Sequence, residues 1–331
     1  MKWLRLAGPA LGMLVLALFI FKIGPHPIWM NLKSLKWKFV PILVLCLSYE
    51  SLNTGAWLTV IGVERRVKFL KLFKAWLAGE AINATIPFMS LGGEPLKAAL
   101  IRDEIPFSRG MASVVIDRTI SSLAGILFAM SGVVLGFRYL TLPLRFKVAI
   151  LVMTVIGAIL MLFLIFAQLH APGSSVVRAF RKVKLVRKDV KTLTFDEYLS
   201  SFYRDHKSKF FLALIMHLSA RIMGGSLETW IILRFWDISV SFISAWLIAS
   251  LTVLIVTLFA FLPSGLGASE GGQVYIFKAM GLDPTVGLSM GIVKRLRKIV
   301  WVMVGLIILA GSRSRPEKLT AMASPEEEAF G

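Results

Sequence analysis

The strongest constraint on this chain is a series of long apolar stretches. An α-helix needs roughly 20 residues to cross the hydrocarbon core of a membrane, which is about 30 Å thick. Six stretches have about that length: 6–23, 39–61, 111–137, 147–169, 209–234 and 286–311. Because 56% of the residues are apolar and the mean hydropathy is +0.75, a water-soluble globule is excluded. The sequence therefore predicts an all-α polytopic membrane protein with about 6–8 transmembrane segments.

Two further apolar segments run into Pro- and Gly-rich sequence. Segment 72–89 leads into IPFMSLGGEP, and segment 241–262 leads into LPSGLGASEGG. Proline lacks the amide hydrogen that a helix interior needs, and glycine is a poor helix former, so both stretches break a helix. We expect re-entrant hairpins over 72–104 and 241–281. The alternative for the second hairpin is that 241–262 crosses the membrane completely.

The two broken segments share their residue spacing, and so do the spans that follow them. In each, a Pro precedes a Glu by seven residues and a Gly precedes an Arg by eight: Pro87 and Glu94 with Gly110 and Arg118, then Pro263 and Glu270 with Gly287 and Arg295. This order predicts an internal duplication. Residues 1–137 would form the first membrane half, 138–146 the connecting loop and 147–311 the second half. With both broken segments re-entrant, the two halves form an inverted repeat.

The basic residues outside the spans predict the orientation of the chain. With two re-entrant hairpins, 23 of the 38 Lys and Arg residues fall on the side of the N-terminus and nine on the opposite side. Cytoplasmic loops carry the excess of basic residues, so we expect a cytoplasmic N-terminus in a multi-pass protein of the cell (inner) membrane. The basic cytoplasmic loop 170–209 is interpreted as lying along the anionic leaflet, with a solvated loop as the alternative. The tail 312–331 is predicted to be disordered.

No motif in the sequence indicates an active site, a metal or a cofactor. The single cysteine, Cys46, excludes an internal disulfide, and the sequence contains neither a Walker loop nor an H-E-x-x-H motif. A G-x-S-x-G pattern occurs at 267–271, but it lacks the preceding strand that a hydrolase nucleophile requires. The formal net charge of +19 is explained by loop bases. We therefore expect no enzyme activity, no cofactor and no nucleic-acid partner.

Charged residues inside the apolar segments are the main candidates for function. Each costs roughly 2.5–3.5 kcal/mol at the centre of a membrane helix, so it should face a cavity or an opposite charge. The bases are Arg118, Arg221, Lys294, Arg295, Arg297 and Lys298. The acids within or beside the apolar segments are Glu50, Glu80, Glu94, Asp117, Glu228 and Glu270. Equal numbers of the two signs make a paired polar interior feasible.

The bases of the last span point to an anionic ligand. Lys294, Arg297 and Lys298 share one side of the predicted helix, Arg295 flanks them, and no single nearby acid neutralises the cluster. Of these, Lys294, Arg295 and Arg297 are predicted to bind the phosphate of a lipid headgroup together with Arg118. The alternative for the lysines is that they reach out to the membrane interface.

The Gly-rich breaks supply the second part of the predicted site. A half-helix that begins at such a break points unpaired amide groups and its positive dipole end into the membrane, which suits a phosphate. We expect Gly92, Gly93 and Gly267 to form this headgroup cradle. The residues expected to couple charge are Glu94, Glu270, Asp117, Arg221 and Glu228. Helix capping is the alternative role of the two glutamates at the breaks.

The helix predicted over 209–234 adds a polar seam. His217, Arg221, Gly224 and Glu228 follow helical spacing and share one face.

These motifs resemble the transmembrane, flippase-like domain of lysylphosphatidylglycerol synthases and its free-standing relatives. The matching pieces are Gly92-Gly93-Glu94-Pro95, Asp117-Arg118 early in the next span, and Pro263 to Glu270 followed by Gly281 and Arg295. The chain departs from the family pattern at Lys97, where members usually have arginine, and at Ser121, where they commonly have an acid. The resemblance implies translocation of an anionic or aminoacylated lipid between leaflets. The 331 residues hold no aminoacyl-transferase domain, so the synthase reaction is not implied.

We therefore expect a lipid flippase or transporter that moves an anionic, aminoacylated or glycosylated (polyprenyl-)phospholipid-type lipid. Its expected partners are membrane lipids, anionic ones above all, and a lipid-modifying enzyme or glycosyltransferase. The alternative is a non-transporting membrane scaffold for such an enzyme, which would act through surface loops such as 170–209. A membrane-embedded enzyme that uses Glu94 or Glu270 as a base is weaker, because no nucleophile or metal set accompanies them.

Overall fold

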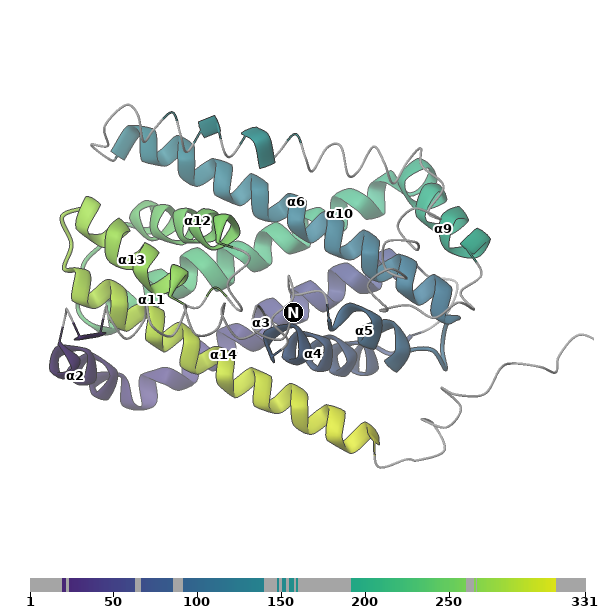
Figure 1. Ribbon diagram of the computed structural model, residues 1–331, viewed down its shortest axis with the longest axis horizontal. Coiled ribbons are helices and arrows are strands. Elements are labelled where there is room, and N and C mark those ends of the chain that lie inside the picture. The colour runs from purple at the N-terminus through teal and green to yellow at the C-terminus, as the bar shows by residue number, and fades with distance from the viewer. Residues whose placement is uncertain are drawn as a thin grey trace, which may run out of the picture.

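The computed structural model shows a bundle of helices (Figure 1). It describes residues 20–21, 24–62, 67–85, 92–139, 148, 151–152, 155–157, 159, 192–259, 265 and 267–313. No strand occurs in these ranges, which confirms the all-α class. The predictions for most of 6–23 and 147–169, for 170–191, and for the tail beyond 313 concern residues outside those described, as do Pro87 and Pro263.

The helices follow the apolar stretches closely. In chain order they are α2 (Pro25–Leu35), η1 (Lys36–Lys38), α3 (Phe39–Ile61), α4 (Phe69–Thr85), α5 (Glu94–Leu100), α6 (Phe107–Tyr139), α9 (Thr192–Asp205), α10 (Lys207–Arg221), the π-helical turn η2 (Ile222–Leu227), α11 (Glu228–Phe235), α12 (Phe242–Leu258), α13 (Ala268–Ala279) and α14 (Pro284–Arg313).

Three helical stretches are long and apolar enough to cross a membrane: Pro25–Ile61, Phe107–Tyr139 and Lys207–Phe235. Helix α14 has 30 residues, but its bases within 294–298 lower its hydropathy. Helix α12 is apolar and has 17 residues. The number of complete crossings stays a prediction.

Apolar side chains cover much of the outer surface of these helices. Val40 and Val44 on α3, Phe211 and Ile215 on α10, and Ile307 on α14 are each more than half exposed, with exposed fractions from 56% to 70%. Contiguous apolar surface of this kind is unfavourable in water and is solvated by lipid chains in a membrane. The packing therefore agrees with a membrane protein.

Each broken segment forms a pair of adjacent helices, α4 with α5 and α12 with α13. Gly93, just before α5, lies so close to α4 that a Cβ atom there would overlap the carbonyl oxygen of Gly79. Gly267, just before α13, has a φ of 76°, which L-residues with side chains rarely adopt. Glycine is thus required at both breaks, in one for close approach and in the other for backbone conformation.

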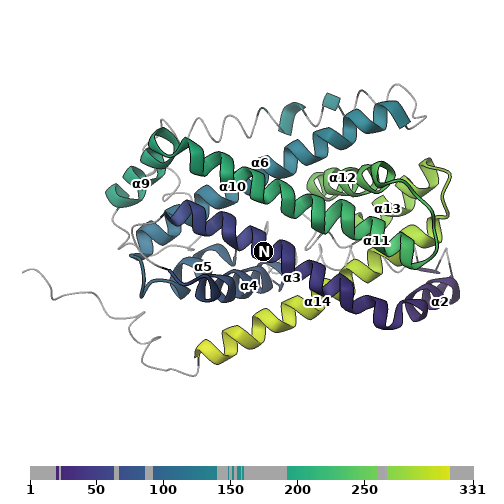
Figure 2. The same ribbon diagram turned by 180° about the vertical axis from the view of Figure 1, so that it is seen from behind.

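The two halves of the chain exchange packing partners: the first helix of each broken segment packs against the last long helix of the other half, and the second helix against that of its own half. Helix α4 packs against α14 and α12 packs against α6, while α5 contacts α6 and α13 contacts α14. Helix α3 lies against α10 across the middle of the molecule (Figure 2). Helices far apart in sequence therefore meet at the centre of the bundle.

The part of loop 170–209 that the structure describes is helical and packs on the protein itself. Phe195, Leu199 and Phe202 on α9 are buried in the same core as α3 and α6. The Tyr198 hydroxyl donates to the carbonyl oxygen of Val60 at 2.6 Å. These apolar residues of α9 thus pack on the protein core, and Tyr198 binds the end of α3.

Candidate functional site

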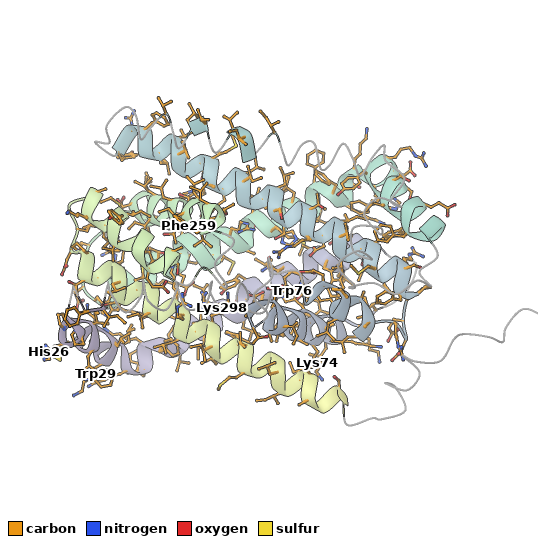
Figure 3. The ribbon with its side chains drawn as sticks, viewed as in Figure 1. His26, Trp29, Lys74, Trp76, Phe259 and Lys298 are labelled. Carbon is orange, nitrogen blue, oxygen red and sulfur yellow. The ribbon has the colours of Figure 1, made fainter. Side chains whose placement is uncertain are left out.

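A cavity of about 280 Å³ lies where the helices of both halves meet. It is lined by residues of α3, α4, α6, α10, η2, α12 and α14. Its charged residues are Arg118, Arg221, Arg297, Glu50 and Glu80. Trp76, which Figure 3 labels, forms part of its wall. The cavity therefore presents both signs of charge beside aromatic surface.

The three arginines differ in how strongly they are held. Arg297 forms an ion pair with the fully buried Glu228. The Arg118 side chain is 39% exposed and its Nη1 lies 4.0 Å from the nearest Glu94 oxygen. Arg221 Nη2 donates to the backbone carbonyl of Ser121 at 2.8 Å, and its Nε has no hydrogen-bond partner among the described residues. Arg118 and Arg221 are therefore the least neutralised cations of the cavity.

The two cavity glutamates also differ. Glu80 forms an ion pair with Lys97 at 2.8 Å. Glu50 accepts hydrogen bonds from Trp76 Nε1 at 2.8 Å and from Asn53 Nδ2 at 3.3 Å. No Lys or Arg within the described residues lies within ion-pair distance of Glu50. Glu50 is thus a carboxylate of the cavity wall that neutral hydrogen-bond donors hold in place.

Lys97 organises the first hairpin. Its side chain is 2% exposed, and Nζ lies between Glu80 and Glu94, 3.3 Å from a Glu94 oxygen. Nζ also lies 3.9 Å from the centroid of the Trp76 ring. Asn83 Nδ2 donates to Glu94 as well, at 3.0 Å. Lys97 is thus closer to Glu94 than Arg118 is, and that carboxylate holds Arg118 only loosely.

The second hairpin uses its glutamate in another way. Glu270 is fully buried and accepts from the Gly267 amide at 3.0 Å and from Ser269 Oγ at 2.8 Å, which caps α13. Its other oxygen binds Arg295, with Nη2 at 2.5 Å and Nε at 2.7 Å. Helix capping, the alternative role that the sequence offered for this residue, is thus present together with an ion pair to Arg295.

The structure brings only part of the predicted site together. Arg118, Arg221 and Arg297 line the cavity, and Glu94 and Glu228 contact two of them. Outside the cavity lining lie Arg295, Lys294, Gly92, Gly93 and Gly267.

Several of the remaining predicted residues are engaged within the protein. Lys294 Nζ donates to Thr229 Oγ1 at 2.7 Å, and the Gly93 amide donates to Asn83 Oδ1 at 2.7 Å. Asp117 Oδ1 contacts His217 Nε2 at 2.9 Å. A phosphate cradle at the glycines stays a prediction.

Sequence reasoning named Glu50 and Glu80 as buried acids and did not place them in the site. The signal that could have placed Glu50 there is its position inside a 23-residue apolar helix. Asn53 and Trp76 carry no such signal, because amides and tryptophans are common in membrane helices without a ligand. Their roles depend on contacts between α3 and α4.

A second cavity, of about 580 Å³, lies at the ends of the long helices. Arg109, Arg204 and Lys209 line it together with Glu197. The Arg109 guanidinium lies 4.9 Å from the centroid of the Tyr198 ring. This cavity is more basic than acidic and adjoins α9.

Comparisons with known proteins agree with this architecture. The pattern of the family described as the lysylphosphatidylglycerol synthase TM region matches residues 5–306. A UPF0104 membrane protein of Pyrococcus horikoshii is 22% identical over 302 residues, which cover 83% of this chain and 87% of that protein. A UPF0104 membrane protein of Methanothermobacter thermautotrophicus is 27% identical over 309 residues, covering 86% of this chain and 88% of the relative. No solved structure matches the chain significantly. This chain therefore belongs to the membrane-protein family of the lysylphosphatidylglycerol synthase transmembrane region.

Proposed function

We propose that the protein moves a phosphate-bearing membrane lipid between leaflets and that the central cavity holds its headgroup. The observation that carries this proposal is the pair Arg118 and Arg221, two cations that line a cavity among apolar helices. Arg118 lies 4.0 Å from its nearest carboxylate, Glu94, and Arg221 donates to a backbone carbonyl. Charged groups inside a membrane protein are costly unless they serve a ligand or a pathway. Arginine binds phosphate in a planar, two-pronged geometry, which suits a headgroup.

The exchange of packing partners supports an inverted repeat. Helix α4 contacts α14 as α12 contacts α6, which is the arrangement that two related halves would give. In transporters built this way, rocking of one half against the other exposes a central site to each side in turn. We extend the proposal to re-entrant α4–α5 and α12–α13 hairpins, and to a cell (inner) membrane protein with a cytoplasmic N-terminus.

The proposed cargo is an anionic, aminoacylated or glycosylated phospholipid, and the proposal assigns no chemical reaction to the chain. Glu50 and Glu80 offer hydrogen-bond acceptors for amino or hydroxyl groups beside the phosphate. Arginines and carboxylates in one cavity thus fit a headgroup that carries both acceptors and donors.

Reconstitution tests the proposal. Purified protein in liposomes should speed the inversion of fluorescent anionic, aminoacylated or glycosylated lipids, measured as loss of fluorescence to a membrane-impermeant quencher. Replacing Arg118 and Arg221 by Gln should slow inversion roughly tenfold or more for each arginine, because a hydrogen bond to a charged group contributes about 1.5–3 kcal/mol.

Arg138→Gln, an exposed position at the far end of the same helix α6, is the matched control and should leave the rate unchanged. Failure of the unmodified protein to speed inversion of any lipid in the panel would contradict the proposed function.

A further inference from the structure

A line of contacts leads from the buried interface of α6 and α10 to the cavity wall. Asp117 Oδ1 on α6 lies 2.9 Å from His217 Nε2 on α10. His217 Nδ1 lies 3.0 Å from Asn53 Oδ1 on α3. Asn53 Nδ2 donates to Glu50 at 3.3 Å, and both of these residues line the cavity. His217 is 1% exposed and Asp117 4%, so the pair is almost completely buried.

The number of protons in this line follows from its donors and acceptors. With Glu50 ionised, Asn53 directs its NH₂ group at Glu50, since the reverse orientation would place its oxygen against a carboxylate. Its Oδ1 therefore faces His217, and that contact requires a hydrogen on Nδ1. The contact between Nε2 and Asp117 also requires a hydrogen, because two acceptors cannot form a hydrogen bond. This set of contacts is therefore the one expected if the Asp117–His217 pair holds one proton more than a neutral imidazole beside a carboxylate.

We infer that the Asp117–His217 pair is the proton-binding site of the transporter and that Asn53 connects it to the headgroup cavity. This inference rests on the proposed function and adds to it the co-transported ion, a proton. The pair carries one positive charge more when the proton is bound. That charge lies behind a cavity wall that binds phosphate, so proton and anionic headgroup stabilise each other's binding.

Loss of the proton changes the cavity through Asn53. The imidazole then has one hydrogen for two acceptors, so one of its two contacts must break or the Asn53 amide must rotate. Rotation of the amide turns its NH₂ group toward His217 and removes that donor from Glu50. Glu50 then accepts a hydrogen bond only from Trp76. The negative charge of Glu50 is then less compensated, so Glu50 repels phosphate more strongly. Release of the proton thereby favours release of the headgroup.

The charged groups around the pair are few. Arg118 follows Asp117 on α6, Arg221 lies one turn beyond His217 on α10, and Glu50 faces it from α3 through Asn53. The turn η2 contains no titratable side chain. Helix α9 packs against both α6 and α10, and its Tyr203 contacts the Phe210 ring and hydrogen-bonds Thr119, two residues after Asp117. Helix α5 packs against α6 and presents Glu94 and Lys97, of which Glu94 lies 4.0 Å from Arg118. Arg118 and Arg221 oppose the extra proton, whereas Asp117 and Glu50 favour it.

The first test measures the proton without any transport. The full chain, labelled with ¹⁵N at its four histidines and held in lipid nanodiscs, is studied by NMR, with His217→Gln identifying the signal. Infrared difference spectra of wild type and Asp117→Asn report a protonated carboxyl group. At neutral pH we expect either both His217 nitrogens protonated or a carboxyl band that Asp117→Asn removes. A neutral imidazole beside an ionised Asp117, unchanged from about pH 5 to about pH 8, would overturn the inference.

The second test measures coupling. In liposomes with a pH gradient of about one unit, the wild type should move an anionic lipid faster from the acid side, with a limit of about tenfold accumulation for one proton per lipid. His217→Gln and Asp117→Asn should bring the ratio of rates with and without the gradient to one. His206→Gln, at the start of α10, is the matched control and should keep the wild-type ratio.

The outcomes separate the two claims. A wild type that moves lipid at the same rate with and without the gradient would overturn proton coupling and leave the proposed function standing. A wild type that moves no lipid would overturn the proposed function and, with it, the coupling. The spectra would still decide whether the pair binds a proton.

Discussion

The two helical hairpins carry the same motif and use it differently. In the first, Glu94 lies 4.0 Å from Arg118, which is 39% exposed and lines the cavity. In the second, Glu270 binds Arg295 at 2.5 Å, and Arg295 is 21% exposed and lies outside the cavity lining. The residue three positions after each glutamate accounts for the difference, because it is Lys97 in the first hairpin and Gln273 in the second.

Lys97 competes with Arg118 for Glu94, and Gln273 cannot compete in this way for Glu270. Lys97 Nζ is within ion-pair distance of both Glu80 and Glu94, so its single charge compensates part of the charge of each carboxylate. Gln273 is buried, and its Oε1 has no hydrogen-bond partner among the described residues. The residue three positions after the glutamate thus accounts for whether the arginine lines the cavity, as Arg118 does, or is bound closely by its glutamate, as Arg295 is.

Replacing Lys97 by Gln should make the first hairpin resemble the second, and should have the largest effect. Glu80 and Glu94 lose their shared cation, and Arg118 should close on Glu94. Breaking a buried ion pair costs roughly 3–5 kcal/mol, so thermal stability in detergent should fall strongly and lipid movement should slow. Lys97→Arg, which keeps the charge, is the control. Unchanged reactivity of Arg118 toward an arginine-specific reagent in the folded Gln variant would contradict the comparison.

Replacing Glu270 by Gln should lower stability by about 1.5–3 kcal/mol, the value of a hydrogen bond to a charged group. Both the cap of α13 and the partner of Arg295 are weakened. The rate of lipid movement per folded molecule should change little, since neither residue lines the cavity. Glu94→Gln, beside Arg118, should alter that rate. Equal effects of the two variants on transport would show that the hairpins do not differ in function.

The reverse exchange, Gln273→Lys, should make the second hairpin resemble the first. The new ammonium group would compete for Glu270 and release Arg295, whose reactivity toward the arginine reagent should rise. Gln273 Oε1 is 3.0 Å from the place where a Cβ atom on Gly291 would lie, so the longer side chain overpacks the site at a cost of about 1–3 kcal/mol. Mass spectrometry of labelled peptides measures the reactivity, and no rise would argue against competition.

Ser269→Ala should have the smallest effect. It removes one donor to Glu270 and should cost about 0.5–1.5 kcal/mol of stability, measured by thermal unfolding. If Lys97 governs the first hairpin, this substitution should leave lipid movement unchanged. A large loss of transport would mean that the second hairpin contributes to the cavity directly.

The sequence was sufficient to predict several of the long helices and three of the residues that line the cavity. Helix α3 begins and ends where its apolar stretch does, and cost arguments for buried charge singled out Arg118, Arg221 and Arg297. From the spacing of the repeat, Arg118 and Arg295 were expected to be equivalent. Their difference depends on which side chain competes for each glutamate in three dimensions, and spacing does not contain that information.

The remaining parts of the site depend on contacts between distant residues, which no local sequence pattern predicts. Asp117 and His217 are 100 residues apart and meet because α6 packs against α10. The π turn at 222–227 changes the helical phase after Arg221, and its only sequence signal is Gly224-Gly225. The inverted orientation of the two halves stays a prediction.

The central claim is that the cavity holds a lipid phosphate, and a cryo-EM structure of the protein in nanodiscs of anionic lipid tests it most directly. The account predicts headgroup density in the cavity, with the phosphate within hydrogen-bonding distance of Arg118 and Arg221. The density should be absent from the Arg118→Gln, Arg221→Gln double variant. Lipid density confined to the outer surface of the helices, with the cavity filled only by water in the wild type, would contradict it.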